Sequence, residues 1–190
     1  MARLLSEEKR NALLSAAASA VALAGVAAST TRIAKDAGVA EGTLFIYFPT
    51  KDDLLNQLYL DLKSDLRRFL AADYPTDAGV REQIQHLWSR FIDWGERNPD
   101  NRGALRQLGV SERITEASQK AGEAMFDDLQ TVVVNGFKAG ILREQPISFL
   151  GGIIQALADM VLEMASRDPA GLERYKSLGW TALWGAITDH

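Results

Sequence analysis

Between Thr31 and Lys51 the chain concentrates side chains that can hold an anion and read the edge of a base. Arg32 and Lys51 offer positive charge to a phosphate, and the Thr31 hydroxyl can donate a hydrogen bond to the same group. Glu41 can accept a hydrogen bond from the amino group of a cytosine. The apolar run Leu44–Phe48 lies in the same stretch. A short helix buries one face only, so some of these apolar side chains must face a partner.

Two short helices joined by a turn would position these side chains. Ser29 or Thr30 is expected to cap the first helix, and Gly38 to end it in the positive-φ conformation that glycine allows. Ala34 supplies the small side chain that two steeply crossing helices need where they touch, and Pro49 ends the second helix. The pattern predicts a helix-turn-helix, whose second helix enters the major groove of DNA by its N-terminal end.

The spacing of the apolar residues separates an inward from an outward face. The inward positions, which fill a three-helix core, are Ile33, Ala37, Val39, Leu44 and Tyr47. The outward positions of the second helix are Ala40, Glu41, Gly42, Thr43, Phe45 and Ile46. Of these, Phe45 and Ile46 can contact thymine methyl groups or sugar edges. Glu41 either accepts from cytosine N4 or is a solvated surface residue, and the sequence leaves both readings open.

The charge distribution favours DNA over a generic turn between core helices. The 190-residue chain has a net charge of −4, but residues 1–51 hold six basic and four acidic residues. A mildly basic N-terminal part on an acidic body indicates a localised contact with an anion, and the net negative charge argues against nonspecific coating of nucleic acid.

Composition also bears on the compartment. The chain has no cysteine, which excludes disulfides, thiolate metal sites and a cysteine nucleophile. The segment Asn11–Ser29 resembles the apolar region of a signal peptide, but Glu7 and Glu8 precede it where such a peptide carries positive charge. Alanine and serine make it weakly apolar for a membrane span. We therefore expect an amphipathic helix of a soluble, cytoplasmic protein that makes no contact with a membrane.

Nearly all of the remaining sequence has helical period. It predicts an all-α fold of about nine helices, with a three-helix helix-turn-helix domain over residues 1–50 and a helical body over residues 51–190. One long helix is expected from about Thr115 to Ala139. Its run Val132–Val134 is also compatible with a strand, but an isolated strand has nothing to pair with, so a helix is favoured.

The last two predicted helices are too apolar for a single interface. Between Pro146 and Ser166 the polar residues Gln155, Asp159 and Glu163 form one narrow stripe. We expect these helices to pack as a four-helix bundle with a second copy of the chain. The predicted dimer contacts are Ile153, Leu157, Val161, Trp180, Leu183, Trp184 and Ile187. The alternative is that both helices are central in the core of a monomer.

The groups that enzymes usually employ are scarce. His86 and His190 are the only histidines, and the sequence contains no zinc-protease, nucleophile-elbow or phosphate-loop motif. We expect no catalysis, no cofactor and no metal site. A helical scaffold or interaction protein without operator binding stays the alternative, although it requires the Thr31–Lys51 pattern to be accidental.

The stretch TTRIAKDAGVAEGTLFIYFPTKDDLL resembles the DNA-binding domain of the TetR family of repressors. The family run is I-A-x-x-A-G-V, then G-T-L-Y-x-Y-F, then K-x-x-L, and the resemblance covers about residues 6–60. It implies DNA contacts by Thr43, Tyr47 and Lys51, with Gly42 allowing close approach. It also implies three helices for DNA and six for ligand binding and dimer formation.

The chain departs from the family at the recognition helix. Many members have serine and lysine in place of Ala40 and Glu41, and tyrosine followed by a polar or basic residue in place of Phe45 and Ile46. The resemblance therefore does not supply the operator sequence.

Further motifs, AEGTLF-YF-TKD-L, YL-LK-DL, RQL-VSE and A-RDPA, resemble the RamR type of multidrug- and bile-acid-responsive repressors. This resemblance implies an inducer pocket lined by Tyr59, Lys63, Trp88, Phe91, Ile92, Met125, Leu129, Ile154 and Ala158. Lys63 would meet an anionic head group, and Ile154 stands where the RamR type has an aromatic residue. Several of these residues are also typical of an ordinary helical core.

The expected function is that of a ligand-responsive repressor. A homodimer would bind a palindromic operator and release it when a lipophilic or amphipathic inducer binds the body, with control of multidrug efflux as the role that the RamR type suggests. The helix that starts at Lys51 and carries Tyr59 and Lys63 would transmit the change.

Overall fold

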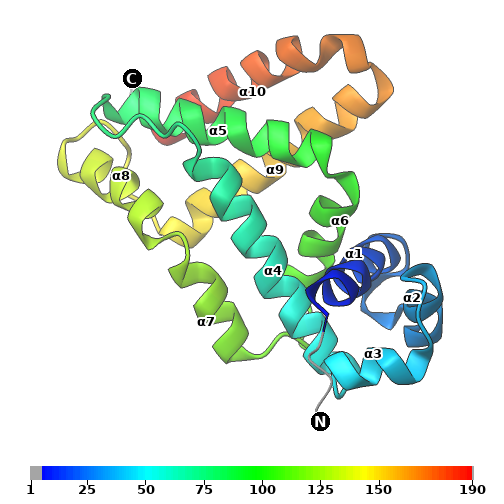
Figure 1. The fold of residues 1–190 in the computed structure, drawn as a ribbon. Helices are drawn as coiled ribbons and strands as arrows, with labels where there is room; N and C mark the ends of the chain where they lie inside the picture. The colour runs from blue at the N-terminus through cyan, green and yellow to red at the C-terminus, as the bar shows by residue number, and fades with distance from the viewer. Residues whose placement is uncertain (1–5, 190) are drawn as a thin grey trace. The chain divides into compact units, whose positions relative to one another are not determined.

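The computed structural model describes residues 6–189 and shows helices throughout the regular structure of this range (Figure 1). The elements are α1 (Glu7–Ala24), η1 (Gly25–Ala27), α2 (Thr30–Asp36), α3 (Glu41–Tyr47), α4 (Lys51–Ala71), α5 (Val80–Arg97), α6 (Pro99–Gly109), α7 (Glu116–Ala124), α8 (Asp127–Lys138), α9 (Ile147–Arg167), η2 (Pro169–Gly171) and α10 (Leu172–Ile187). The predicted all-α fold is confirmed, with ten α-helices in the described range and two short 3₁₀ turns.

The count exceeds nine because the long helix expected from Thr115 to Ala139 is two helices, α7 and α8. Phe126 leaves helical geometry with φ −110° and ψ 4°, and α8 starts directly after it. Asp127 and Asp128 occupy the first turn of α8, where the positive end of a helix favours acidic side chains. The two adjacent acidic residues therefore mark the start of a new helix inside a stretch whose helical period is otherwise continuous. The run Val132–Val134 lies inside α8, as favoured.

The chain forms two compact units. One comprises the chain up to Asp65 together with Asn98–Met125, and the other comprises Leu66–Arg97 together with the chain from Phe126 onward. The boundaries of these units differ from the predicted domain boundary at residue 50. The assignment of DNA binding to residues 1–50, and of ligand binding and dimer formation to residues 51–190, stays a prediction about function.

The core of the first unit is built on one face of α1. Ser6 caps this helix by accepting a hydrogen bond from the Lys9 N–H at 3.4 Å. Leu13 and Val21 are fully buried, and α1 packs against α2 and α6. These contacts fix the helix to which the helix-turn-helix is attached.

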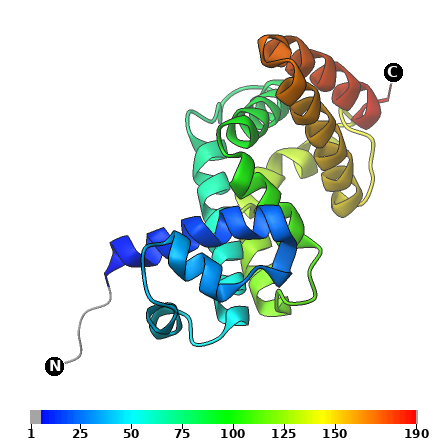
Figure 2. The same ribbon diagram turned by 90° about the vertical axis from the view of Figure 1, so that its right-hand side faces the viewer.

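The turn between α2 and α3 has the predicted geometry. Ser29 caps α2 by accepting from the Arg32 N–H, and Gly38 adopts φ +72°. The Val39 N–H then donates to the Ala34 carbonyl at 2.9 Å, which closes the turn. Ala34 and Leu44 are buried, so α2 and α3 meet closely (Figure 2). The helix-turn-helix is thereby held by packing on α1 and by its own turn.

The second unit is organised around Trp88 of α5. Its indole N–H donates to the Lys176 carbonyl of α10 at 2.9 Å. A Cβ atom added at Gly179 would lie 2.6 Å from the Trp88 ring, so only glycine lets α10 approach this closely. The helices α9 and α10 form a hairpin closed by η2 and pack against each other and against α5 (Figures 1 and 2).

Two stretches of the described chain, Glu7–Ala27 and Ile147–Arg167, have the length and apolar character of a membrane span. Core helices of soluble proteins meet the same two criteria. The first buries Leu13, Ala17 and Val21 in the core of its unit, whereas α9 keeps an apolar face exposed, which is described below.

Candidate DNA-binding site

The recognition helix α3 presents an open, partly apolar surface. Phe45 is 40% exposed and Ile46 is 65% exposed. Apart from its chain neighbours and the backbone of α3, nothing in the described structure lies within 4 Å of the place where a Cβ would stand on Gly42, which suits the close approach of a base edge. Leu44 is buried, so the apolar run divides between an inner and an outer face as the spacing predicts.

The carboxylate of Glu41 joins the starts of α2 and α3. Its Oε1 atom accepts hydrogen bonds from the hydroxyl of Thr30 at 2.7 Å and from that of Thr31 at 2.9 Å. The Thr31 hydroxyl, predicted to donate to phosphate, uses its only proton on this contact. Glu41 is half-buried and hydrogen-bonded, so it is more than the solvated surface residue that the sequence left open.

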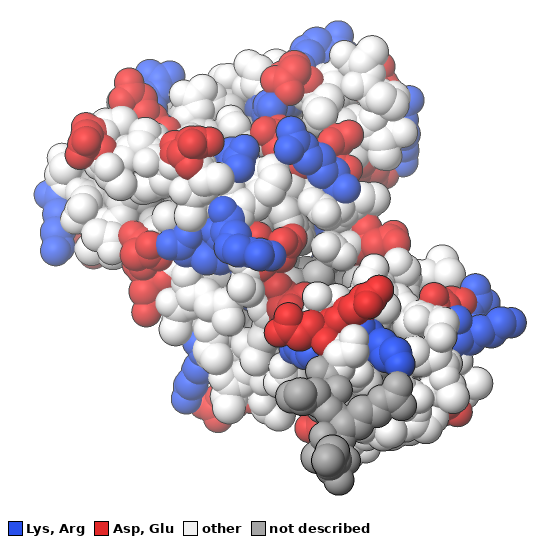
Figure 3. All heavy atoms as spheres, viewed as in Figure 1, with Lys and Arg blue, Asp and Glu red and all other residues white. Residues whose placement is uncertain are grey.

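Basic side chains lie on α2, where Figure 3 shows them at the right-hand edge of the view beside acidic ones. The Arg32 Nε atom lies 2.7 Å from Asp36, and the Arg32 side chain is 71% exposed. An exposed pair of this kind contributes little to stability. Arg32 can therefore exchange Asp36 for a phosphate at small cost.

The Tyr47 hydroxyl accepts a hydrogen bond from the Ser6 N–H at 2.9 Å. The contact ties the end of α3 to the cap of α1. It leaves the phenolic proton available to a phosphate, because the hydroxyl acts here as an acceptor. Tyr47 thus fits both the inward position that spacing predicts and the DNA contact that the family resemblance implies.

A reciprocal capping box holds the start of α4, at Lys51. The Asp53 N–H donates to the Thr50 hydroxyl at 3.1 Å, while the Thr50 N–H donates to the Asp53 carboxylate at 3.0 Å. Burial lowers the pKa of the Lys51 ammonium, and the nearby Arg113 guanidinium lowers it further. The Arg113 guanidinium therefore lies close enough to the start of α4 to disfavour the charge of Lys51.

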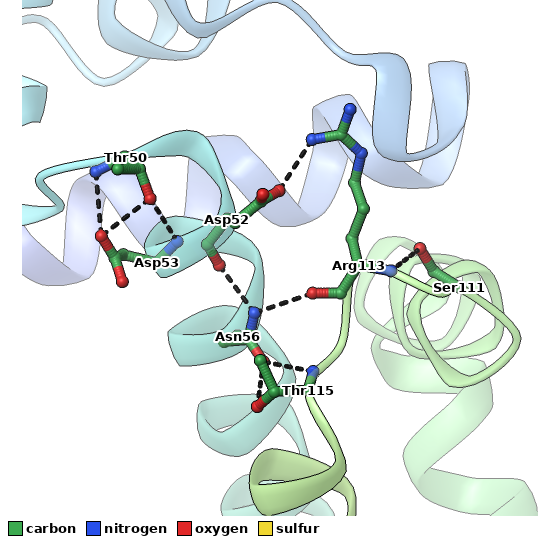
Figure 4. Close-up of polar contacts among 7 residues, drawn as sticks. All are labelled: Thr50, Asp52, Asp53, Asn56, Ser111, Arg113 and Thr115. Carbon is green, nitrogen blue, oxygen red and sulfur yellow. Dashed lines mark hydrogen bonds and ion pairs between the residues drawn. The ribbon is translucent and has the colours of Figure 1, made fainter.

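Asn56 joins this helix start to the segment between α6 and α7 (Figure 4). Its amide nitrogen donates to the carbonyls of Asp52 at 2.8 Å and Arg113 at 2.9 Å. Its oxygen accepts from the Thr115 N–H at 2.9 Å and from the Thr115 hydroxyl at 3.2 Å. Arg113 also pairs with the Asp52 carboxylate at 2.7 Å. Sequence reasoning missed this network, because its members are about sixty residues apart.

In the first unit, Tyr59 and Lys63 of the predicted ligand set lie together on α4. The Lys63 ammonium is 5.6 Å from the centre of the Tyr59 ring. Burial lowers the pKa of Lys63, although the nearby Glu123 carboxylate acts in the opposite direction. A Cβ at Gly122 of α7 would stand 2.7 Å from the Tyr59 ring, so this glycine permits the contact between α4 and α7. Met125 of the same unit is half-buried.

The other predicted ligand residues belong to the second unit. Trp88, Ile92 and Ala158 are buried in its core, with Phe91 and Ile154 packed against them. Leu129 is also buried. The structure accounts for Trp88 as the link between α5 and α10, and its contact with a ligand stays a prediction.

The predicted dimer residues fall into two groups. Val161, Trp180, Leu183 and Ile187 are buried within their own chain, where they pack in the core of the second unit. Ile153, Leu157 and Trp184 are half-buried. The first group packs in the core of its own chain, and its role in a dimer contact stays a prediction. The exposed apolar side chains nearby, which sequence reasoning did not select for this role, are Phe149, Met160 and Met164 of α9 and Leu178 of α10.

His86 has a local structural role. Its Nε2 atom lies 3.2 Å from the Leu70 carbonyl, and its ring meets Tyr74 edge-on. His190 lies outside the described residues.

This geometry, a short second helix with an exposed N-terminal surface in a three-helix unit, is that of a helix-turn-helix domain. Residues 13–58 match the sequence profile of the bacterial regulatory proteins of the tetR family. The crystal structure of a TetR family transcription regulator from Marinobacter aquaeolei VT8 superposes with a TM-score of 0.87 at 22% identity and covers 97% of both chains. Residues 13–58 thus resemble the DNA-binding domain of the TetR family, and the chain has the fold of TetR-family transcription regulators.

Two curated relatives match part of the chain. A nucleoid occlusion factor, SlmA, from Haemophilus influenzae is 30% identical over 118 residues, which are 61% of this chain and 53% of that protein. The fatty acid metabolism regulator protein of Bacillus subtilis is 26% identical over 60% of each chain. The chain therefore matches little more than half the length of these relatives. The structure of a Bacillus subtilis transcriptional regulator, FadR, in complex with stearoyl-CoA has a TM-score of 0.69 at 17% identity, covering 92% of this chain and 97% of that one.

The substitution Asn56→Ala tests the network in Figure 4. It removes a side chain that makes four hydrogen bonds, so we expect the free energy of unfolding to fall by about 1–3 kcal/mol. Urea unfolding followed by circular dichroism measures the change. The matched control is Gln57→Ala on the same helix, whose side chain makes one exposed contact with Arg10 and should change stability by less than about 0.5 kcal/mol. Equal effects of the two substitutions would contradict the anchoring role of Asn56.

Proposed function

We propose that the protein is a ligand-responsive transcriptional repressor that binds a palindromic DNA operator as a homodimer. The observation that carries the proposal is the exposed surface of α3 in a domain that matches the TetR family over residues 13–58. The alternative, a helical scaffold without operator binding, leaves the exposure of Phe45 and Ile46 without a partner.

In this proposal two sets of residues divide the contact with DNA. Base edges meet the outward residues of α3 and its cap: Ala40, Glu41, Gly42, Thr43, Phe45 and Ile46. Phosphates meet Arg32, Tyr47 and Lys51, which can offer charge or a proton. Thr31 joins the second set only if its hydroxyl leaves Glu41.

Dimer formation is proposed through the exposed apolar face of α9 and α10. Phe149 is 61% exposed, Met160 is 48% exposed, and Leu178 of α10 is 61% exposed. Gly152 and Ala156 of α9 are exposed small residues at helical spacing from Phe149 and Met160, and they would let a second α9 approach closely. Together with Ile153 and Leu157 this face would pack as half of a four-helix bundle. The twofold symmetry of such a dimer is what a palindromic operator requires, with half-sites about 34–36 Å apart.

The proposed inducer is an amphipathic anion. Lys63 is a cation in partly desolvated surroundings beside an aromatic ring, where burial disfavours its charge and the Glu123 carboxylate favours it. The anionic group of a ligand would act in the same direction as Glu123. The stearoyl-CoA bound to the FadR structure and the bile acids of the RamR type are both apolar bodies with an anionic group. The resemblance to the RamR type, and control of multidrug efflux with it, rests on sequence motifs alone.

The proposed mechanism uses α4 as the connection between ligand and DNA. Lys51 stands at its first residue, and Tyr59 and Lys63 follow two and three turns later. A ligand that binds only when α4 is displaced would move Lys51 and release the operator. Release requires the ligand to have different affinities for the two states. A cytoplasmic location follows from operator binding.

The phosphate contact is tested by Lys51→Ala. We expect weaker binding to every duplex and a decrease of about two in the magnitude of the slope of log affinity against log salt concentration, since the homodimer loses one phosphate contact in each protomer. Fluorescence anisotropy with the palindrome upstream of the gene measures both quantities. Lys138→Ala, which removes the same charge from an exposed position on α8, should leave the slope unchanged. A slope that does not respond to Lys51→Ala would remove Lys51 from the interface.

The dimer face is tested by Met160→Glu. A charge placed in the centre of an apolar interface should give monomers that keep their helical content, because Met160 is exposed in the single chain. Light scattering gives the mass and circular dichroism the helicity. The control is Thr131→Glu, which is exposed on α8 and outside this face, and it should stay dimeric. A dimer that persists in Met160→Glu would show that the chains associate elsewhere.

The inducer site is tested by Lys63→Met. We expect stearoyl-CoA and cholate to release a labelled operator from the unsubstituted protein, and to need about tenfold higher concentration or more with the variant, which has lost a charged contact. Operator affinity without ligand should not fall, because Lys63 lies three helical turns from Lys51 on α4. Lys120→Met, on the exposed face of α7, is the matched control. If the two variants respond alike, the anion binds elsewhere.

A further inference from the structure

Glu41 is held in place by the helix that precedes its own. It is the first residue of α3, and its Oε1 accepts from the hydroxyls of Thr30 and Thr31, the first two residues of α2. A surface glutamate normally samples several rotamers and loses that freedom on binding. Here two hydrogen bonds within the protein fix the side chain before any partner arrives, which lowers the entropic cost of a further contact.

The carboxylate keeps the capacity to accept more hydrogen bonds. An ionised carboxylate has about four acceptor positions, and the two hydroxyls share a single oxygen. No donor or cation among residues 6–189 contacts the other oxygen, Oε2. The nearest basic residue in the first turn of α2, Arg32, is engaged with Asp36 instead.

The surroundings admit a base edge at this point. Gly42, the next residue, faces open space, and Ile46 lies one helical turn further along the exposed surface. In a helix-turn-helix the N-terminal residues of the second helix are the ones that reach base edges in the major groove. Glu41 is the first of these residues in α3.

Only one base offers this carboxylate a favourable partner. Guanine presents two acceptors in the major groove, and thymine presents an acceptor and a methyl group. Adenine has an amino donor, but its N7 acceptor lies beside it and repels an anion. Cytosine presents the N4 amino group with no acceptor of its own next to it.

The charge of Glu41 also acts on every other sequence. A carboxylate near the phosphate backbone is repelled, and no cation of the described chain neutralises it. That repulsion is offset only where the cytosine contact forms. The Glu41 charge therefore weakens complexes with DNA that lacks the cytosine more than complexes with DNA that contains it. Specificity is gained in this way without higher affinity for the operator.

We propose that Glu41 is a specificity-determining residue, which selects a cytosine in each half-site of the operator and weakens binding to other sequences. The inference rests on the proposed operator binding and names the base that α3 reads first.

The experiment is selection of bound duplexes from a random pool with the unsubstituted protein, with Glu41→Gln and with Glu144→Gln. The last variant removes the same charge from an exposed loop position between α8 and α9 and serves as the control. We expect one cytosine per half-site that the unsubstituted protein and the control both enrich and that Glu41→Gln does not, with the other positions of the site retained. The preference for that cytosine should fall about tenfold, as for the loss of one charge-assisted hydrogen bond. Binding of Glu41→Gln to unrelated duplexes should become stronger.

A second measurement uses the unsubstituted protein alone, so it does not depend on how the variant folds. Replacing the selected cytosine by 2-pyrimidinone removes the N4 amino group, and we expect affinity to fall about tenfold for the unsubstituted protein and to change little for Glu41→Gln. Enrichment of the same cytosine by Glu41→Gln, or equal losses with both proteins, would overturn the role of Glu41. A failure of the unsubstituted protein to enrich any sequence would contradict the proposed function itself.

Discussion

The side-chain amide of Asn56 is the contact on which the candidate DNA-binding surface most depends. It satisfies two carbonyls and a backbone N–H that lie on separate segments, at Asp52, Arg113 and Thr115. An amide can donate twice and accept twice, so a single residue closes the whole set. The first turn of α4, with Lys51 at its start, is fixed by this residue and by the Thr50–Asp53 capping box rather than by helix propensity alone.

The hydrogen bonds of Asn56 also connect α4 to α7. Thr115, which Asn56 binds, is also the cap of α7, where it accepts from the Ser118 N–H. Further along, Gly122 of α7 abuts the Tyr59 ring of α4. The two helices are thus joined near the start of α7 and again at Gly122. A ligand that displaces Tyr59 or Lys63 would shift α7 and pull on the hydrogen bonds at Asn56. The strain would then act at the turn that positions Lys51, which gives the proposed release of DNA a path through named contacts.

The sequence predicted the local structure of this site well. A cap at Ser29 or Thr30 and the positive φ of Gly38 each depend on the chemistry of one or two residues, and the structure confirms the cap at Ser29 and the φ of Gly38. The sequence did not predict the contacts between distant segments. Helical period indicates which face of a helix is buried, but not which residue that face packs against. The bond from Ser6 to Tyr47 and the link from Asn56 to Thr115 are of this kind.

The last two helices show the same limit from another side. α9 and α10 carry more apolar residues than one buried face can hold, which indicates that each helix is buried on more than one side. The helical period does not show which of these sides packs within the same chain. Trp180, Leu183 and Ile187 are covered by packing within the second unit, around Trp88 and Gly179. The surplus that remains lies on the opposite side of α9, at Phe149 and Met160. A buried side chain cannot join an interface without unfolding its own core, so a second copy of the chain would have to meet α9 through residues that the monomer leaves open. The exposed apolar residues of α9 are therefore the ones on which the proposal of dimer formation rests.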